Sequence, residues 1–184
     1  MRFPFERSLC HELCSLSRAA ELVARDQGRT LWAPETAGVK FQDVPDGPAP
    51  AETPTLRLAQ MKNLAARFTA TLTGWKDDES EAEVLRLLPR RFYRYDITAA
   101  TETHPNLHDG ALFAFVQGTD PEVVLLMEDV VLGDRRRWQY AFARSTSGAL
   151  EGRLDGQLAW KAKRSTNTTS RADPQITIKR VFEN

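Results

Sequence analysis

The sequence predicts an α+β fold, in which a curved antiparallel sheet of about six strands wraps one helix behind an N-terminal helical extension. Between Val84 and Lys163 the apolar residues come in short runs separated by turn residues, a pattern typical of successive strands. These runs are joined by segments too short to hold a crossover helix, so the strands should pair antiparallel. A single apolar helical face precedes them, and we expect the sheet to cover it.

Residues 1–44 are predicted to form the helical extension. Pro4 suits the first turn of a helix there, and Gly28 suits its end. The apolar residues recur at alternating spacings of four and three, which is the period of an amphipathic helix: Leu9, Leu13, Leu16, Ala20 and Val23. Residues 45–54 then hold four prolines in ten residues, a composition that favours an extended linker.

A second helix is expected to open the α+β sheet domain, residues 55–184. Thr53 followed by Pro54 has the pattern of an N-cap and a first-turn proline. The period changes from 3.6 to 2 near Phe68, so this helix should run directly into the first strand. Its apolar positions share one face: Leu58, Met61, Leu64, Ala65 and Phe68.

Several strand regions follow. Pro89 lacks an amide proton and marks a bulge, an edge or a bend within the first of them. Asp155-Gly156 is a strong hairpin signal. Residues 111–117 and 123–128 are apolar on both faces, so both faces of the sheet should be covered, by the first helix or by a second copy in a homodimer. The further regions are 83–95, 138–142, 148–154, 157–163 and 176–182.

The balance of charge bears on the classes of partner. Lys and Arg together number 25, as do Asp and Glu, so no net field would draw the chain to nucleic acid. Arginines do alternate with aromatic residues around Tyr93, as on single-strand nucleic-acid platforms, but the neutral total argues against that function. No apolar run approaches the roughly 20 residues of a membrane helix, and charged residues interrupt the N-terminus where a signal-peptide core would lie. We therefore expect a cytoplasmic protein that does not bind membranes.

Aromatic residues at strand positions suggest a ligand-binding surface. The sequence has no nucleophile elbow, phosphate-binding glycine loop or zinc-protease helix motif. This combination favours a non-enzymatic module that binds a small apolar ligand or a protein partner. The alternative is that the rings belong to the core. The five candidate ligand-binding residues are Tyr93, Tyr95, Trp138, Tyr140 and Phe142.

Two pairs of residues could supply metal ligands. Cys10 and Cys14, with His104 and His108, provide the four soft or borderline ligands of a tetrahedral zinc site. The cysteines could equally be free thiols that flank the helix stripe. Zinc is the single candidate metal, and we predict no other cofactor. His104 and His108 with nearby carboxylates could instead serve a hydrolase-type or metal-assisted enzyme, the alternative function, unless both are solvated loop residues.

Four segments carry a resemblance to a protein family. They are Leu85–Pro89 (LRLLP), Tyr93–Tyr95 (YRY), Asp109–Glu122 (DGALFAFVQGTDPE) and Trp138–Arg144 (WQYAFAR). Together they resemble a group of uncharacterised bacterial proteins found mainly in planctomycetes. The likeness spans about Met61 to Lys163, and residues 1–54 fall outside it, as expected of a variable extension. The resemblance implies no known activity, cofactor or catalytic residue.

Overall fold

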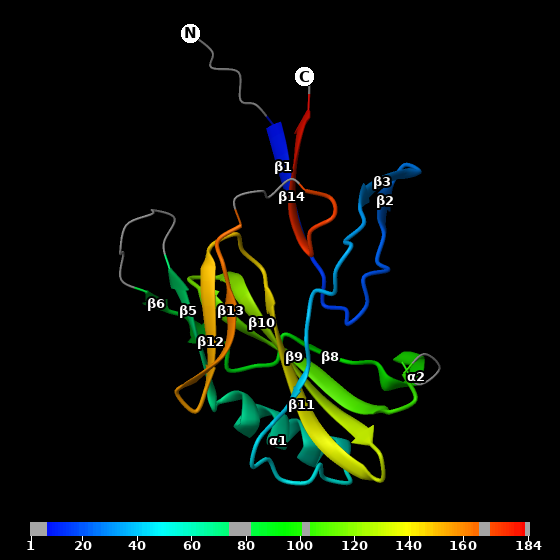
Figure 1. The fold of residues 1–184 in the computed structure, drawn as a ribbon, viewed down its shortest axis with the longest axis vertical. Coiled ribbons are helices and arrows are strands. Elements are labelled where there is room, and N and C mark those ends of the chain that lie inside the picture. Colours follow the sequence, from blue (N-terminus) through cyan, green and yellow to red (C-terminus); the bar gives the residue numbers. More distant parts are fainter. Residues whose placement is uncertain (1–6, 74–81, 101–103, 166–169, 183–184) are drawn as a thin grey trace.

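The computed structural model describes residues 7–73, 82–100, 104–165 and 170–182. Strands dominate these residues, and all pairs of strands run antiparallel. A twelve-residue helix, α1 (Pro54–Ala65), and a single helical turn, α2 (Ile97–Ala100), complete the regular structure (Figure 1). The predicted α+β class with antiparallel strands is confirmed. The predicted single curved sheet is wrong, because the described strands form several separate, open sheets.

The larger sheet has six strands. Its centre is the meander of β9 (Leu107–Gln117), β10 (Asp120–Leu132) and β11 (Arg135–Arg144), which matches the central apolar strands expected from the sequence. Three short strands pair with its two outer members. They are β4 (Gln42–Asp43) beside β11, and β7 (Arg86–Leu87) and β8 (Tyr93–Arg94) beside β9.

The smaller sheet has four strands, in the order β13-β12-β5-β6. The strand after α1 begins at Phe68, as predicted, and the Asp155-Gly156 turn joins a hairpin, as predicted. Val84 belongs to this sheet and Arg86 to the larger one, so the chain changes sheets across one residue. This change of partner is why one continuous sheet does not form. The members are β5 (Phe68–Thr73), β6 (Glu83–Val84), β12 (Ala149–Leu154) and β13 (Gln157–Ala162).

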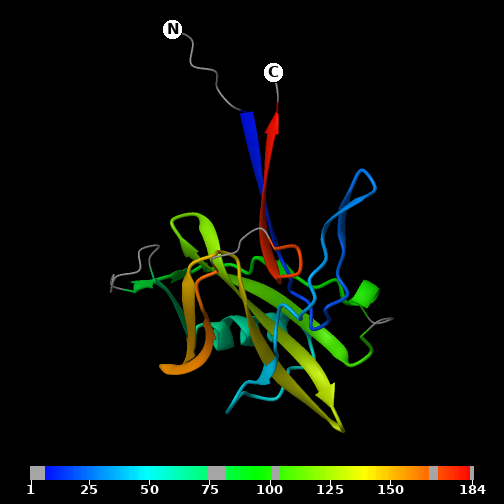
Figure 2. The same ribbon diagram turned by 45° about the horizontal axis from the view of Figure 1, so that its top comes forward.

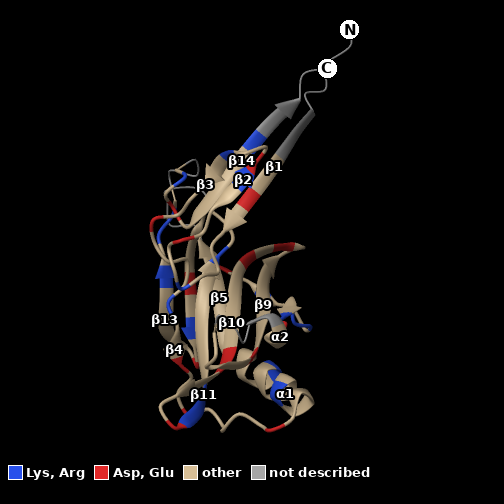
Figure 3. Cartoon of the chain, turned by 90° about the vertical axis from the view of Figure 1, so that its right-hand side faces the viewer, with Lys and Arg blue, Asp and Glu red and all other residues tan. Residues whose placement is uncertain are grey.

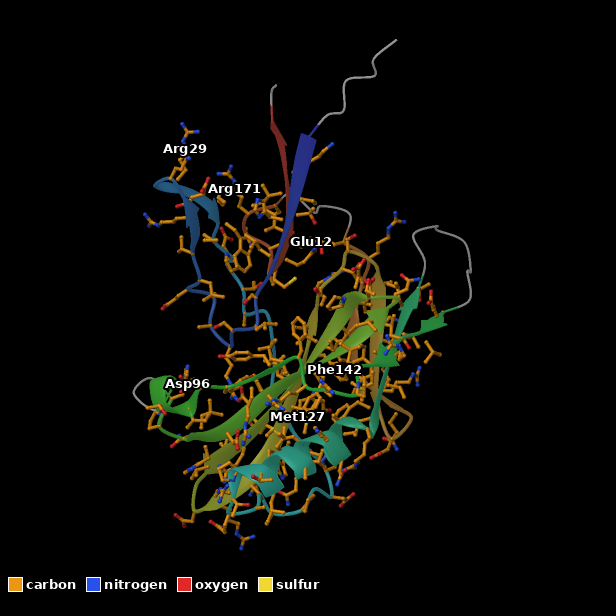
Figure 4. All side chains as sticks on the ribbon, turned by 180° about the vertical axis from the view of Figure 1, so that it is seen from behind. Glu12, Arg29, Asp96, Met127, Phe142 and Arg171 are labelled. Atoms are coloured by element: carbon orange, nitrogen blue, oxygen red, sulfur yellow. The ribbon has the colours of Figure 1, made fainter. Side chains whose placement is uncertain are left out.

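Helix α1 packs on one face of the central meander, at the end of the molecule opposite β1 and β14 (Figure 1). Its start is the predicted one, because the Thr53 hydroxyl accepts the Leu56 backbone N–H at 3.4 Å. Met127 and Phe142 lie inside the body above the helix (Figure 4). The helix buries three side chains against them: Met61, Leu64 and Ala65. This face holds the main hydrophobic core, and it extends to the smaller sheet.

The predicted N-terminal helix is wrong. Residues 7–14 form strand β1 (Arg7–Cys14), which pairs along its length with β14 (Gln175–Phe182). The serines that follow provide a local reason. The Ser15 hydroxyl accepts the Ser17 amide N–H at 3.3 Å, and the Ser17 hydroxyl accepts the Ala19 amide at 3.0 Å. Such bonds offer the backbone an alternative to the helix that the apolar spacing suggests.

Strands β1 and β14 form a two-stranded ribbon that projects away from both sheets (Figures 1 and 2). A second hairpin, β2 (Ala24–Asp26) with β3 (Arg29–Trp32), lies beside it. Basic and acidic residues are intermixed over the elements (Figure 3). Within the described residues, no helix has both the length and the apolar character needed to cross a membrane.

Candidate functional site

A hollow lies on the face of the larger sheet that points away from α1. Side chains alternate along a strand, so Met127 of β10 faces the helix and its neighbours Leu126 and Glu128 face the opposite side. A pocket of about 860 Å³ opens over this outer face. We call it the outer-face pocket. Its floor is apolar and comes from β9 and β10: Leu112, Leu126 and Val130.

The N-terminal segment covers part of the outer-face pocket. Residues 16–19 and Phe41 form one wall. This wall is joined to residues 38 and 39 by hydrogen bonds, because the Gly38 and Val39 amides both donate to the Ser17 carbonyl, at 3.0 and 3.3 Å. A Cβ atom at Gly38 would lie 1.9 Å from the Ser15 carbonyl oxygen. The close approach of the backbone at residue 38 to residue 15 therefore requires a glycine. Residues far apart in the sequence therefore build the wall together.

A buried carboxylate, Glu128, lies in the pocket. The Tyr95 hydroxyl donates to Glu128 Oε1 at 3.1 Å, and Arg18 donates to Oε2. The Glu128 side chain is 8% exposed. Burial raises the pKa of Glu128, although the nearby Arg18 charge acts in the opposite direction. A carboxylate at this place is thus held by two donors in poorly solvated surroundings.

Tyr95 reaches Glu128 because residue 110 is a glycine. The Tyr95 amide donates to the Gly110 carbonyl at 2.9 Å, and the ring lies against the bare Cα of Gly110. A Cβ atom there would lie 2.4 Å from Tyr95 Cδ2. Burial, together with the charge of Glu128, raises the pKa of Tyr95. The phenol therefore stays protonated and acts as a donor.

Arg18 is the third polar group at this point. Its guanidinium carbon lies 3.7 Å from the centre of the Phe41 ring, a cation–π arrangement. Its Nη1 atom lies 3.5 Å from Gln139 Oε1, and its Nη2 atom donates to Glu128. The side chain is 50% exposed, so Arg18 spans from the buried carboxylate to the pocket mouth.

The five aromatic residues expected to bind a ligand lie on two different faces. Tyr93 and Tyr95 line the outer-face pocket. Trp138, Tyr140 and Phe142 lie in the main core on the α1 side and are almost fully buried. The structure therefore brings two of the five to one pocket and separates the other three from it. Direct contact of any of them with a ligand stays a prediction.

The two predicted pairs of metal ligands do not meet. Among the residues that the structure describes, no three His, Cys, Asp or Glu gather closely enough to hold a metal ion. Cys10 and Cys14 lie on β1, where a separation of four residues spans about 13 Å. They are therefore not one helical turn apart, as the predicted helix would place them. Cys14 Sγ donates to a serine hydroxyl at 3.9 Å. His104 lines the outer-face pocket, whereas His108 is an exposed residue of β9.

A second polar cluster lies on the opposite face, next to α1. Asp109 and Asp129 are paired across β9 and β10, and both are almost fully buried. Arg57 Nε donates to Asp109 at 2.7 Å, and Arg94 Nη2 donates to the same oxygen at 2.7 Å. Arg136 forms an ion pair with Asp129. Burial alone would raise the pKa of Asp109, but the hydrogen bonds from Arg94 and Arg57 outweigh it and hold the pKa below its ordinary value.

This cluster fixes the entry to α1. Arg57 donates to the Glu52 carbonyl at 2.8 Å, and Arg94 donates to the Pro54 carbonyl at 2.8 Å. Arg136 donates to the Ala51 carbonyl at 3.3 Å. Each guanidinium thus joins a buried aspartate to the proline-rich segment. The role of this cluster is structural: it anchors the linker and the helix to the strands.

A smaller hollow of about 290 Å³ lies where the β1–β14 ribbon meets the body. Gln175, at the start of β14, lines it and is 2% exposed. Neither its amide nitrogen nor its amide oxygen has a hydrogen-bond partner among the described residues. Arg144 also lines this hollow, but its guanidinium already donates to three backbone carbonyls.

The sequence analysis did not connect Glu128 to Arg18 or Tyr95. One signal was present, because Glu128 and Asp129 interrupt a strand whose other residues from 123 to 132 are apolar. A carboxylate in such a strand needs a partner. The identity of that partner could not be read, since Arg18 lies 110 residues away in the chain.

Comparisons with protein-family models, with curated proteins and with solved structures found no match to this chain.

Proposed function

We propose that this protein is a non-enzymatic binding module that takes a small, largely apolar ligand into the outer-face pocket. The observation that carries the proposal is the pocket itself, with its volume of about 860 Å³ and its apolar floor. Pockets of roughly 300–1,000 Å³ with apolar walls and a few convergent polar groups hold small molecules in many proteins. The convergent polar groups here are Glu128, Tyr95 and Arg18.

The arrangement of these polar groups favours binding over catalysis. Glu128 already accepts hydrogen bonds from Tyr95 and Arg18, and Tyr95 is held in its protonated form. Ser17, a hydroxyl residue of the lining, accepts the Ala19 amide proton in a local turn. Groups that are already hydrogen-bonded in this way can orient a bound molecule. Catalysis by a nucleophile would instead need an adjacent base to activate it.

One observation favours the alternative of a hydrolase-type enzyme: His104 and Glu128 line the same pocket, and burial raises the pKa of Glu128. Such a pair could supply an acid and a base. The enzyme hypothesis predicts turnover of an apolar ester that is lost in both His104→Ala and Glu128→Gln. Equal turnover in both variants and in the native chain would exclude these residues as its source.

The binding proposal is tested with a neutral apolar dye such as Nile red. We expect saturable binding of one dye per chain, with an increase in fluorescence. Leu132→Trp, on the same face of β10 as Leu126 and Glu128, should place its ring in the pocket and weaken binding at least about tenfold. The matched control is Leu158→Trp, which adds the same ring at an exposed position of β13. Thermal melting checks that both variants fold. Equal dye binding by the two variants would place the dye elsewhere and reject the proposal.

A further inference from the structure

We infer that the ligand of the outer-face pocket carries an organic cation, an ammonium or guanidinium group on an apolar body, and that Arg18 occupies the position of that cation when no ligand is bound. This inference rests on the proposed function and specifies the class of ligand. It follows from three observations: what the Arg18 guanidinium contacts, which of its contacts are fixed, and what charge remains if Arg18 withdraws.

Among the described residues, the groups that contact the Arg18 guanidinium are a carboxylate, an amide oxygen and an aromatic ring, and each of these receives a cation. Glu128 accepts two kinds of donor, one from Arg18 and one from Tyr95. The Phe41 ring presents its face at 3.7 Å, and the Gln139 amide oxygen lies at 3.5 Å. A carboxylate, an aromatic face and an amide oxygen together form the chemistry that recognises guanidinium and ammonium groups.

The receiving groups are fixed, whereas Arg18 can be replaced. Glu128 and Gln139 lie opposite each other on β10 and β11, in the middle of the larger sheet. Tyr95 is held against Gly110. Arg18, in contrast, is half exposed and comes from a segment that has neither helix nor strand structure. A ligand cation therefore has a preformed site, and its competitor is one side chain at the pocket mouth.

The charges of the pocket select the sign of the ligand. Asp96 and Glu128 both line it, and Arg18 and His104 are the lining residues that can carry a positive charge. Withdrawal of Arg18 leaves the buried Glu128 carboxylate without its ion-pair partner, which is costly in poorly solvated surroundings. An incoming cation restores the pair, whereas an incoming anion would face two carboxylates. The apolar body of such a ligand would lie over Leu112 and Leu126.

The test compares four probes that share one eight-carbon chain: octylguanidinium, octylamine, octanol and octanoate. Each displaces bound Nile red in a competition assay at neutral pH. We expect both cations to bind at least about tenfold more tightly than octanoate. The affinity for octanol should lie between that for the cations and that for octanoate. Glu128→Gln should abolish this preference, so that the two cations bind no more tightly than octanol does.

A second pair of variants tests the role of Arg18. Arg18→Ala should strengthen binding of octylguanidinium about threefold or more, because the competing side chain is removed. Arg18→Lys keeps a positive charge at this position and should behave as the native chain does. Thermal melting shows whether each variant folds, and Arg18→Gln is a second neutral variant should the alanine variant fail to fold.

The outcomes separate the inference from the proposed function. If octanoate or octanol competes as well as octylguanidinium, the pocket binds apolar ligands but the cation inference is wrong. If no probe competes and Nile red itself does not bind, the proposed function is wrong as well. Weaker cation binding in Arg18→Ala would also overturn the inference, since Arg18 would then belong to the ligand site rather than compete for it.

Discussion

Two adjacent carboxylates on β10 have opposite roles because successive side chains of a strand point to opposite faces. Asp129 points to the α1 side, where it joins an arginine cluster that anchors the helix. Glu128 points to the outer-face pocket, where its partners are Tyr95 and the half-exposed Arg18. A buried aspartate with several fixed arginines stabilises the fold, and a buried glutamate with one replaceable partner is suited to binding.

Replacing Asp109 tests the structural cluster. Asp109→Asn removes the charge that Arg57 and Arg94 share, so we expect the free energy of unfolding at pH 7 to fall by roughly 3 kcal/mol. The folded pKa of Asp109 lies below its ordinary value of 3.8, so its stabilisation is present above that pH and is lost as the pH falls through the lowered value. Urea denaturation at pH values from 7 down to 2 measures this loss of stability. The Asp109→Asn variant should lack the part of the loss at low pH that comes from protonation of Asp109.

Asp155→Asn is the matched control for the charge change. Asp155 also accepts hydrogen bonds from an arginine, Arg67, but it lies at the exposed turn between β12 and β13. An exposed ion pair contributes little, so this variant should unfold at nearly the native urea concentration. Equal losses in the Asp109 and Asp155 variants would contradict a special role for the buried cluster.

Gly110 provides a second prediction at the scale of single residues. Gly110→Ala places a Cβ atom against the Tyr95 ring, so the ring must move away from β9 and from Glu128. We expect a loss of roughly 1–3 kcal/mol in the free energy of unfolding, measured by urea denaturation. Gly47→Ala is the control, because a Cβ atom there would make ordinary contacts at 3.4 Å. An unchanged stability of the Gly110 variant would show that the close approach is not strained.

At the scale of elements, α1 is the part of the fold that its own sequence defines most completely. Its N-cap, its first-turn proline and its buried positions Met61, Leu64 and Ala65 follow from local patterns, and the structure confirms each of them. Phe68, predicted on the same helical face, lies in β5 instead. Strand β1 is the opposite case. The spacing of its leucines suits a helix, but the backbone bonds of β1 go to β14, more than 160 residues later in the chain. Short apolar segments take their structure from their partners when partners are present.

The helix cap gives a prediction for this scale. Thr53→Ala removes the hydroxyl that accepts the Leu56 amide, so we expect the free energy of unfolding to fall by about 1 kcal/mol. Thr55→Ala makes the same chemical change inside the first turn of α1 and should have a smaller effect. Thermal or urea unfolding of both variants measures the difference, and equal effects would argue that Thr53 does not act as a cap.

At the scale of the whole molecule, the described chain has a thick body and a thin projecting ribbon (Figure 1). Strand β10 lies between β9 and β11, and both of its faces are covered by apolar clusters. Among the described strands, β1 pairs only with β14, and β14 pairs only with β1. Stability should therefore be unevenly distributed along the chain.

Hydrogen exchange monitored by mass spectrometry tests this distribution. Amides of residues 123–128 should exchange only through global unfolding, whereas amides of β1 and β14 should exchange through local opening of the ribbon. Residues 149–154 of β12 serve as an internal comparison, because they also lie between two strands. Protection of the ribbon equal to that of β10 would mean that the ribbon and the body unfold together.

The sequence by itself determined the features that depend on neighbours in the chain. The period of the apolar residues defined α1, the central strands and the hairpin at Asp155-Gly156, because side-chain periodicity and turn chemistry act over a few residues. The antiparallel class followed from the short connections, which leave no room for crossovers.

Only the tertiary structure decided the division into several sheets, the β1–β14 ribbon and the outer-face pocket. Each depends on pairs of residues that are distant in the chain, such as Arg18 with Glu128 or Gly38 with Ser15. No local pattern encodes such pairs, because which side chains meet across a sheet depends on the register and on the face they share. The same fact explains why the five aromatic candidates divide between the core and the pocket.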